Sequence, residues 1–317
     1  MIKFSFAILL FSSFYIYAQD LSDQYIGPGN ADVKDFCITA GNRYVYTAVQ
    51  NRIVLYDILT GEQLHSVQLN DHEEIFSIAL SPDSTFLVAG TDSGSMIILN
   101  LIDESQESIQ ISNQPVTSVA INRFVSRIAS GTADGEIILT DILGGSPERF
   151  KPHEQIVTDI AFSSDGTLLL SSGMDGRIIV TDLSGELDYY CLTEKNIPCR
   201  SIAINDNISA LVAAYDDGAV YQWRISSNHT FNDIGKRVLR GWATGVDFNH
   251  DGRSWTYCSS NGRIEIVTVL GSKYTARIKG VATRIKFCYI QEPKLLVLVS
   301  AYRGGLLKIP AKNMKLK

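Results

Sequence analysis

A short turn signal recurs at nearly equal intervals along this chain of 317 residues, and this period limits its fold more than any other feature. The turns combine a polar residue with glycine, except in the first copy, and they are Gln50-Asn51, Asp92-Ser93-Gly94, Asp134-Gly135, Asp175-Gly176, Asp217-Gly218, Asn261-Gly262 and Arg303-Gly304-Gly305. From Gly94 onward, the steps between glycines are 41, 41, 42, 44 and 42 or 43 residues. Seven copies of so small a unit predict an array of similar supersecondary elements.

Each turn joins two apolar runs that have the length of β-strands. Around Asp175-Gly176, for example, the runs cover residues 168–173 and 177–182. Asp-Gly between such runs is a strong hairpin signal, because both central residues of the turn adopt positive φ. A third run with alternating apolar residues precedes each hairpin, as in 158–162, and a more polar fourth run follows most of them. Each unit is therefore predicted to be a four-stranded antiparallel sheet with a polar outer strand.

A single sheet of this kind cannot bury both of its faces, whereas seven sheets around a ring pack against one another. We therefore predict an all-β protein, a seven-bladed β-propeller of four-stranded antiparallel blades that forms one domain over residues 19–317. The last unit supplies three strands and ends in a basic tail, residues 311–317, that we expect to be solvated. The segment 23–26 precedes the first blade, and we predict that it closes the ring as the outer strand of the last blade. A free N-terminal linker is the alternative.

The third strands end in residue pairs that define the repeat more closely, and these are Tyr56-Asp57, Leu99-Asn100, Thr140-Asp141, Thr181-Asp182, Trp223-Arg224, Val267-Thr268 and Ile309-Pro310. This arrangement resembles the WD-repeat family of β-propellers, in which a Trp-Asp pair ends the third strand and an Asp lies in the turn. Three of the seven pairs keep the Asp and one keeps the Trp, so the repeats are degenerate. Related propeller families stay open as alternatives.

The same family also pairs a histidine before the first strand of a blade with the Asp of that blade's turn. His153 and Asp175 have this spacing, and the resemblance implies a structural role in which the pair ties the entering loop to the turn. The alternative is a general base with its orienting carboxylate. The sequence places no nucleophile beside the pair, which favours the structural role.

Residues 1–18 have the features of a secretory signal peptide, with Lys3 near the start, an apolar core and Ala18 before the expected cleavage site. We predict an exported protein, periplasmic or secreted, whose mature chain has no membrane span; an uncleaved anchor is the alternative. Removing these residues takes away one Lys and no acid, so the formal charge changes from −6 to −7. An acidic surface argues against nucleic-acid binding, which needs clustered Lys and Arg.

Residue types that commonly serve in catalytic or metal-binding sites do not form a recognisable motif in this sequence. None of the five His and five Cys follows metal-ligand spacing, and the sequence has no nucleophile elbow, phosphate-binding loop or dinucleotide fingerprint. We therefore predict no metal, no cofactor and no catalytic residue. The five Cys are an odd number, and Cys191 with Cys199 is the one candidate disulfide.

Recognition is the remaining class of function, because loops on a rigid scaffold commonly carry binding residues. In a propeller, the turns described above share one face with the loops that connect successive blades. Aromatic residues and Arg are common anchors of protein interfaces, and with one Met they form the predicted binding set of Trp242, Tyr215, Tyr302, Arg303, Arg240 and Met174. We predict a non-catalytic scaffold that binds a protein partner there, as a monomer or in a complex. Packing of Tyr215 and Trp242 between blades is the alternative.

The rival function is a propeller-fold hydrolase or lyase that acts on a sugar or an ester in the channel mouth. It requires several acidic or His side chains from different blades to converge at the channel. Such convergence depends on the closed ring, since blades that face each other are far apart in the sequence.

Overall fold

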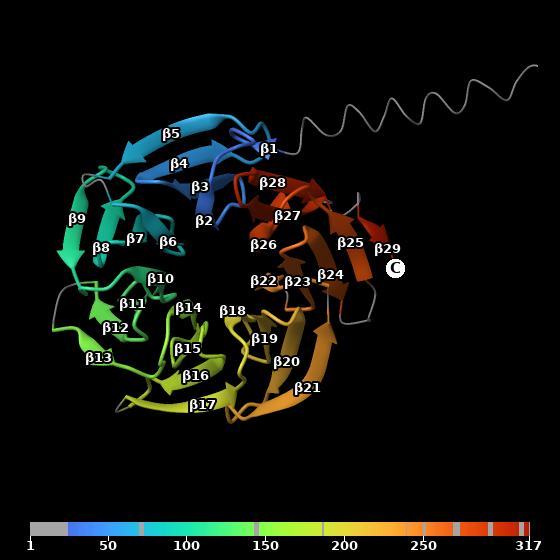
Figure 1. The fold of residues 1–317 in the computed structure, drawn as a ribbon. Coiled ribbons are helices and arrows are strands. Elements are labelled where there is room, and N and C mark those ends of the chain that lie inside the picture. The colour runs from blue at the N-terminus through green and yellow to red at the C-terminus, as the bar shows by residue number, and fades with distance from the viewer. Residues whose placement is uncertain are drawn as a thin grey trace, which may run out of the picture.

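The computed structural model describes residues 25–69, 73–142, 146–185, 187–238, 240–249, 252–268, 273–290, 294–310 and 314–316. All regular structure in these ranges is β-strand, arranged as seven antiparallel sheets that form the blades of a ring (Figure 1). The predicted seven-bladed propeller is therefore confirmed. The signal peptide predicted at 1–18 lies outside the described residues, and no described helix is long and apolar enough to cross a bilayer.

Every blade has the same order of strands from the channel to the rim, and blades are numbered by their innermost strands. The innermost strands are β2 (Val33–Ile38), β6 (Ile75–Leu80), β10 (Val116–Ile121), β14 (Val157–Phe162), β18 (Cys199–Ile204), β22 (Ala243–Phe248) and β26 (Ala282–Ile290). The second strands are β3 (Tyr44–Val49), β7 (Phe86–Thr91), β11 (Arg127–Thr132), β15 (Leu168–Gly173), β19 (Ala210–Tyr215), β23 (Ser254–Ser259) and β27 (Lys294–Ala301).

The remaining strands carry each blade outward to the rim. The third strands are β4 (Arg52–Asp57), β8 (Ser95–Asn100), β12 (Ile137–Asp141), β16 (Arg177–Asp182), β20 (Ala219–Ile225), β24 (Arg263–Thr268) and β28 (Gly305–Pro310). The outermost strands are β5 (Gln63–Gln68), β9 (Gln106–Gln110), β13 (Glu148–Phe150), β17 (Asp188–Glu194), β21 (Phe231–Val238), β25 (Lys273–Arg277) and, for blade 7, β1 (Tyr25–Ile26).

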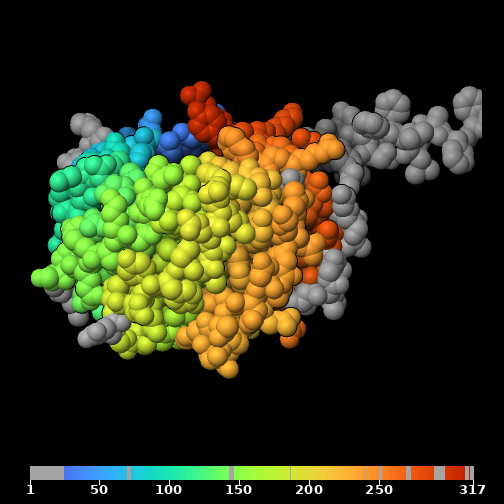
Figure 2. Space-filling model, turned by 60° about the horizontal axis from the view of Figure 1, so that its bottom comes forward, coloured from blue at the N-terminus to red at the C-terminus, as the bar shows by residue number. Residues whose placement is uncertain are grey.

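The burial of a strand follows its place in the blade. All residues of the second strand β15 are buried, whereas most of the outermost strand β17 in the same blade is exposed. The core lies between neighbouring blades, as where Leu170 of blade 4 packs in one cluster with Trp223 and Tyr215 of blade 5. Figure 2 shows the wall that results on one side, where green, yellow and orange blades follow one another as a continuous packed surface.

The ring is closed by the N-terminal strand, as the sequence predicts. In β1, Tyr25 pairs with Leu307 and Ile26 pairs with Leu306 of β28, and Figure 1 shows the two strands side by side. Ile26 is fully buried in the cluster that joins blades 1 and 7. The N–H of Gly27 donates to the carbonyl of Gly61 at 3.1 Å, which ties the strand to blade 1. The two ends of the propeller are therefore held together without a covalent link.

The C-terminal tail differs from the sequence-based expectation of a solvated end. Strand β29 (Lys315–Leu316) pairs with β25 and adds a fifth strand to blade 6. Met314, just before it, is buried in the core cluster of blades 6 and 7. Sequence reasoning missed this strand because two residues are too few to show a strand periodicity.

Candidate functional site

The turns between second and third strands contact the loops that connect the blades, and these segments form what we call the upper face. The carbonyl of Gly135, in the turn of blade 3, accepts a hydrogen bond from the N–H of His153 in the next loop at 3.3 Å. The carbonyl of Gly176 accepts one from the N–H of Lys195 at 3.2 Å in the same manner. The connecting loops that follow blades 3 and 4 are therefore anchored to the turn of the preceding blade.

His153 also anchors its loop to the blade that follows. Its Nδ1 lies 3.2 Å from both carboxylate oxygens of Asp175, and its Nε2 lies 2.8 Å from the hydroxyl of Ser171. Burial disfavours the charge of Asp175, but hydrogen bonds from His153 and from the N–H groups of Arg177 and Glu154 outweigh it and hold the pKa of this carboxyl below its usual range. The structure thus brings His153 and Asp175 together as a tie between loop and turn.

The expectation that no nucleophile lies beside this pair is wrong, because the Ser171 hydroxyl contacts His153 directly. Carboxylate, imidazole and hydroxyl follow one another as in a hydrolytic triad. His153 and Ser171 are each 1% exposed, however, so a substrate cannot reach the hydroxyl. The sequence could not indicate this contact, since Ser171 belongs to an apolar buried strand.

The channel holds an ion pair network that sequence reasoning missed. Arg284 of blade 7 lies 3.8 Å from a carboxylate oxygen of Asp35 in blade 1 and 3.5 Å from one of Asp159 in blade 4. The same carboxylates accept hydrogen bonds from Ser77 and Ser201 of the following blades, at 3.0 and 2.9 Å. Burial opposes the charge of Arg284, but the two carboxylates outweigh it and raise the pKa of the guanidinium. The network links blades on both sides of the channel.

These channel positions share one local geometry. The pairing of the first two strands shifts by one residue near the start of each innermost strand, as between Val157 and Asp159. A bulge of this kind re-aims the following side chain. The residues after the seven bulges are Asp35, Ser77, Ser118, Asp159, Ser201, Gly245 and Arg284.

A third channel carboxyl, Asp247 of blade 6, has a raised pKa. Burial is the chief cause that raises its pKa to about 6, although Lys286 and the N–H of Phe287 act in the opposite direction. The Phe287 N–H donates to its carboxylate at 2.8 Å. Within the described ranges, no group of three or more His, Cys, Asp and Glu is arranged to hold a metal ion.

The upper face exposes part of the predicted binding set over blades 6 and 7. Trp242 is 56% exposed, and its backbone is fixed because its N–H donates to the Ser260 hydroxyl at 3.0 Å. The guanidinium of Arg200 lies 5.9 Å from the centre of the Trp242 ring. Asp216 holds that guanidinium through two hydrogen bonds of 2.7 Å.

Tyr302 and Arg303 lie in the turn of blade 7. Tyr302 is 52% exposed, and the guanidinium of Arg303 is 5.2 Å from its ring centre. The N–H of Tyr302 donates at 2.9 Å to the carbonyl of Val281, which is itself 40% exposed. We call Trp242, Val281, Tyr302, Arg303 and Arg200 the upper patch. Sequence reasoning missed Val281 and Arg200. Val281 could have been recognised from the sequence, because it is an apolar residue in a connecting loop.

The other predicted binding residues lie elsewhere. Tyr215 is fully buried, with its ring against Tyr221 at 5.2 Å, so packing between blades describes its position. Met174 is half-buried in the turn of blade 4. Arg240 is exposed beside Trp242, and its side chain lines a pocket between blades 5 and 6.

The two cysteines that are close in sequence are both free in the structure. Cys199 is buried and Cys191 is exposed. Burial raises the pKa of both thiols. The disulfide that the sequence offered as a candidate for these two residues does not form in the structure.

The fold and the blade geometry define a seven-bladed β-propeller built from WD-like repeats. Two segments, residues 61–99 and 145–182, match the family model described as WD domain, G-beta repeat. Each match runs from the outer part of one blade to the third strand of the next, and the second contains His153 and Asp175. The matches support assignment of the chain to the WD-repeat propeller family. Propellers of this family are typically non-catalytic scaffolds for protein interactions, and no curated protein matches the chain.

Proposed function

We propose that this protein is a non-catalytic scaffold that binds a protein partner through the upper patch, in an exported compartment. The observation that carries the proposal is the exposure of Trp242, Val281 and Tyr302 on successive loops of one face. Two cationic side chains, Arg200 and Arg303, lie against the exposed rings. Trp, Tyr and Arg are enriched among the few residues that supply most of the binding energy at protein interfaces.

The upper patch also has the rigidity that favours binding. Trp242 is tied to the turn of blade 6 through Ser260, whose own N–H donates to the Trp242 carbonyl at 2.9 Å. The backbone of Tyr302 is tied in the same way to Val281. Loops whose backbone is already held in place lose less conformational entropy when a partner binds. This arrangement supports a preformed docking surface.

A comparison of two faces tests the proposal. The double variant Trp242→Ala/Tyr302→Ala removes the aromatic part of the patch, and Phe124→Ala removes an aromatic side chain that is 65% exposed in a turn on the opposite face. Both variants should melt close to the unmodified protein, because surface substitutions usually change stability by less than about 0.5 kcal/mol per site. Proteins recovered with each variant from the native envelope are then compared by quantitative mass spectrometry.

The proposal expects at least one partner to be recovered with the unmodified protein and with Phe124→Ala but lost from the double variant. Equal recovery of every partner with all three proteins would contradict a binding role for the upper patch. Export is tested separately by the mass of the N-terminal peptide. A peptide that starts at Gln19 supports cleavage after Ala18, and one that retains residues 1–18 contradicts it.

A further inference from the structure

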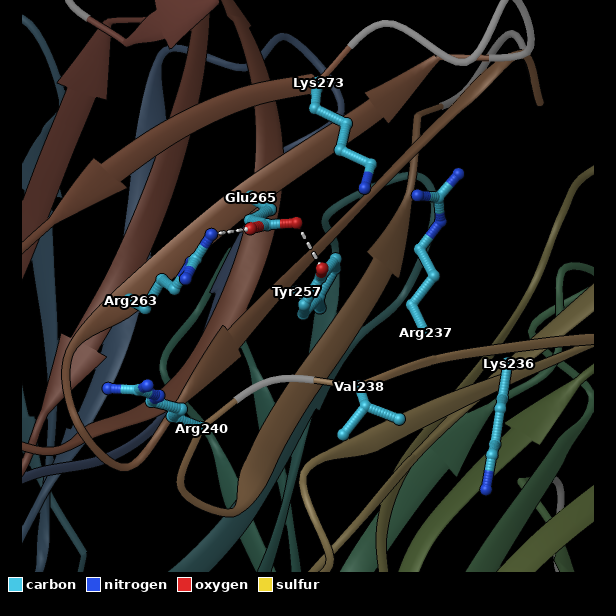
Figure 3. Close-up of a pocket in the computed structure, with 8 residues that line it drawn as sticks. All are labelled: Lys236, Arg237, Val238, Arg240, Tyr257, Arg263, Glu265 and Lys273. Carbon is cyan, nitrogen blue, oxygen red and sulfur yellow. Dashed lines mark hydrogen bonds and ion pairs between the residues drawn. The ribbon is translucent and has the colours of Figure 1, made fainter. Parts of the chain in front are cut away.

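A concave site lies at the rim between blades 5 and 6. It has a volume of about 540 Å³, which is within the usual range of small-molecule sites. One wall comes from the outermost strand of blade 5 and the loop after it, with Arg237, Val238 and Arg240. The other wall comes from blade 6, and Figure 3 shows its side chains around the opening.

The floor of this pocket is a buried polar pair whose charge is already balanced. Tyr257 and Glu265 are both almost fully buried, and the tyrosine hydroxyl donates to the Glu265 carboxylate. The guanidinium of Arg263 lies 2.5 Å from the other carboxylate oxygen. Burial and the bond to Glu265 raise the pKa of Tyr257, so its hydroxyl stays a neutral donor. The acid on the floor and its Arg therefore leave no net charge.

The remaining cations of the pocket have no such balance. Among the residues that the structure describes, Arg237, Arg240 and Lys273 form no ion pair with a carboxylate. Figure 3 shows the ends of Arg237 and Lys273 on the same side of the pocket, above Tyr257 and Glu265, while Lys236 points away. The pocket thus concentrates positive charge in a protein whose formal charge is −6.

Two cationic side chains at the rim of blade 3 are paired with carboxylates. In blade 3, Arg149 lies 3.2 Å from Glu136 and Lys151 lies 3.0 Å from Asp134. These two residues also lie at the rim, on the outermost strand or directly after it. Blade 3 therefore offers two balanced rim cations with which the unbalanced cations of the pocket can be compared.

The geometry points to an organic phosphate ester as the ligand of this pocket, with its phosphate held by Arg237 and Lys273, whose ends lie on the same side of the pocket in Figure 3. A phosphate dianion carries two negative charges, which match these two cations, and its terminal oxygens can accept from both, whereas a single carboxylate carries only one charge. Trp255 and Tyr257 stack at 5.1 Å next to Arg237, which lies 5.8 Å from the Trp255 ring centre. The volume of the pocket leaves room beside the phosphate for the organic part of such an ester. The pocket is independent of the upper patch and its partner.

A charge-matched pair of variants tests this inference. Glycerol 3-phosphate is titrated into the full protein at low salt, with calorimetry and tryptophan fluorescence as readouts, because Trp255 lies beside Arg237. Arg237→Gln/Lys273→Gln removes two pocket cations, and Arg149→Gln/Lys151→Gln removes two balanced rim cations. We expect saturable binding at one site that weakens by at least about tenfold in the first variant and is unchanged in the second.

Vesicles separate the two sources of such a phosphate. Co-sedimentation with phosphatidylcholine vesicles that contain phosphatidic acid, compared with phosphatidylcholine alone, shows whether a lipid headgroup is bound. Binding of either phosphate form that is lost in Arg237→Gln/Lys273→Gln supports the inference. Equal binding by both double variants, no binding of either form, or preference for an acidic peptide overturns it. If the first double variant does not fold, the single variant Lys273→Gln, at a half-buried residue of strand β25, replaces it with the same criteria.

Discussion

Adding one methyl group to the turn glycine of blade 4 is predicted to destabilise the protein. Gly176 has a φ of +79°, and a Cβ at this position would lie 1.7 Å from the carbonyl oxygen of Lys195 and 2.6 Å from that of Ile197. An alanine at positive φ alone costs about 1–2 kcal/mol. The loop must also move, which breaks the Lys195 to Gly176 hydrogen bond of 3.2 Å and adds about 1 kcal/mol. Gly176→Ala should therefore destabilise the protein by about 2–4 kcal/mol.

The assay is equilibrium unfolding in urea, with Gly185→Ala as the matched control. A Cβ at Gly185 meets no atom within 4 Å, and this glycine is exposed in the turn that leads to the outermost strand of the same blade. The control should change the free energy of unfolding by less than about 0.5 kcal/mol. Equal effects of the two substitutions would refute the argument that turn and connecting loop are in direct contact.

Three further predictions concern buried polar groups. His153→Ala should lower the free energy of unfolding by about 2–4 kcal/mol, and the exposed control His65→Ala by less than about 1 kcal/mol; similar losses would contradict the tie between loop and turn. Arg284→Met leaves two channel carboxylates without their cation and should cost about 2–4 kcal/mol in the same assay, so an unchanged unfolding midpoint would contradict the network. The pKa of Asp247 is raised to about 6 in the folded protein, so its stabilising contribution is present below about pH 4 and is lost as pH rises through about 6. Asp247→Asn should therefore gain stability relative to the unmodified protein between pH 4 and pH 8, by roughly 1–3 kcal/mol, and a constant difference across this range would contradict the raised pKa.

Much of the fold could be predicted because its signals are local and repeated. Asp175-Gly176 and its equivalents mark the hairpins, and the alternation of apolar residues marks the innermost strands. Ring closure by Ile26 was predictable from counting, since the last blade lacked an outer strand and the N-terminal segment had no other pairing. Two-residue strands such as β29 carry no comparable signal.

The sites were harder to predict because their residues meet across the ring. Asp159 and Arg284 lie in blades 4 and 7, with two blades between them in the sequence, and the sequence does not show which blades face each other at the channel. Tyr215 was expected on the upper face because it ends a strand at the turn, but its side chain points into the core between two blades. Trp242 and Tyr302 lie in loops and turns, where aromatic side chains have fewer buried partners, and both are exposed.

The measurement that tests the account most directly compares chains that begin at residue 19 and at residue 28. The shorter chain lacks β1, including the fully buried side chain of Ile26 and its pairing with Leu306. The loss of this side chain alone should lower the free energy of unfolding by about 2–5 kcal/mol. Amide exchange should rise first at Leu306 and Leu307, the pairing partners of β1, because the outer edge of β28 then becomes open to solvent. Equal unfolding midpoints with unchanged exchange at these amides would contradict a ring that the N-terminal strand holds closed.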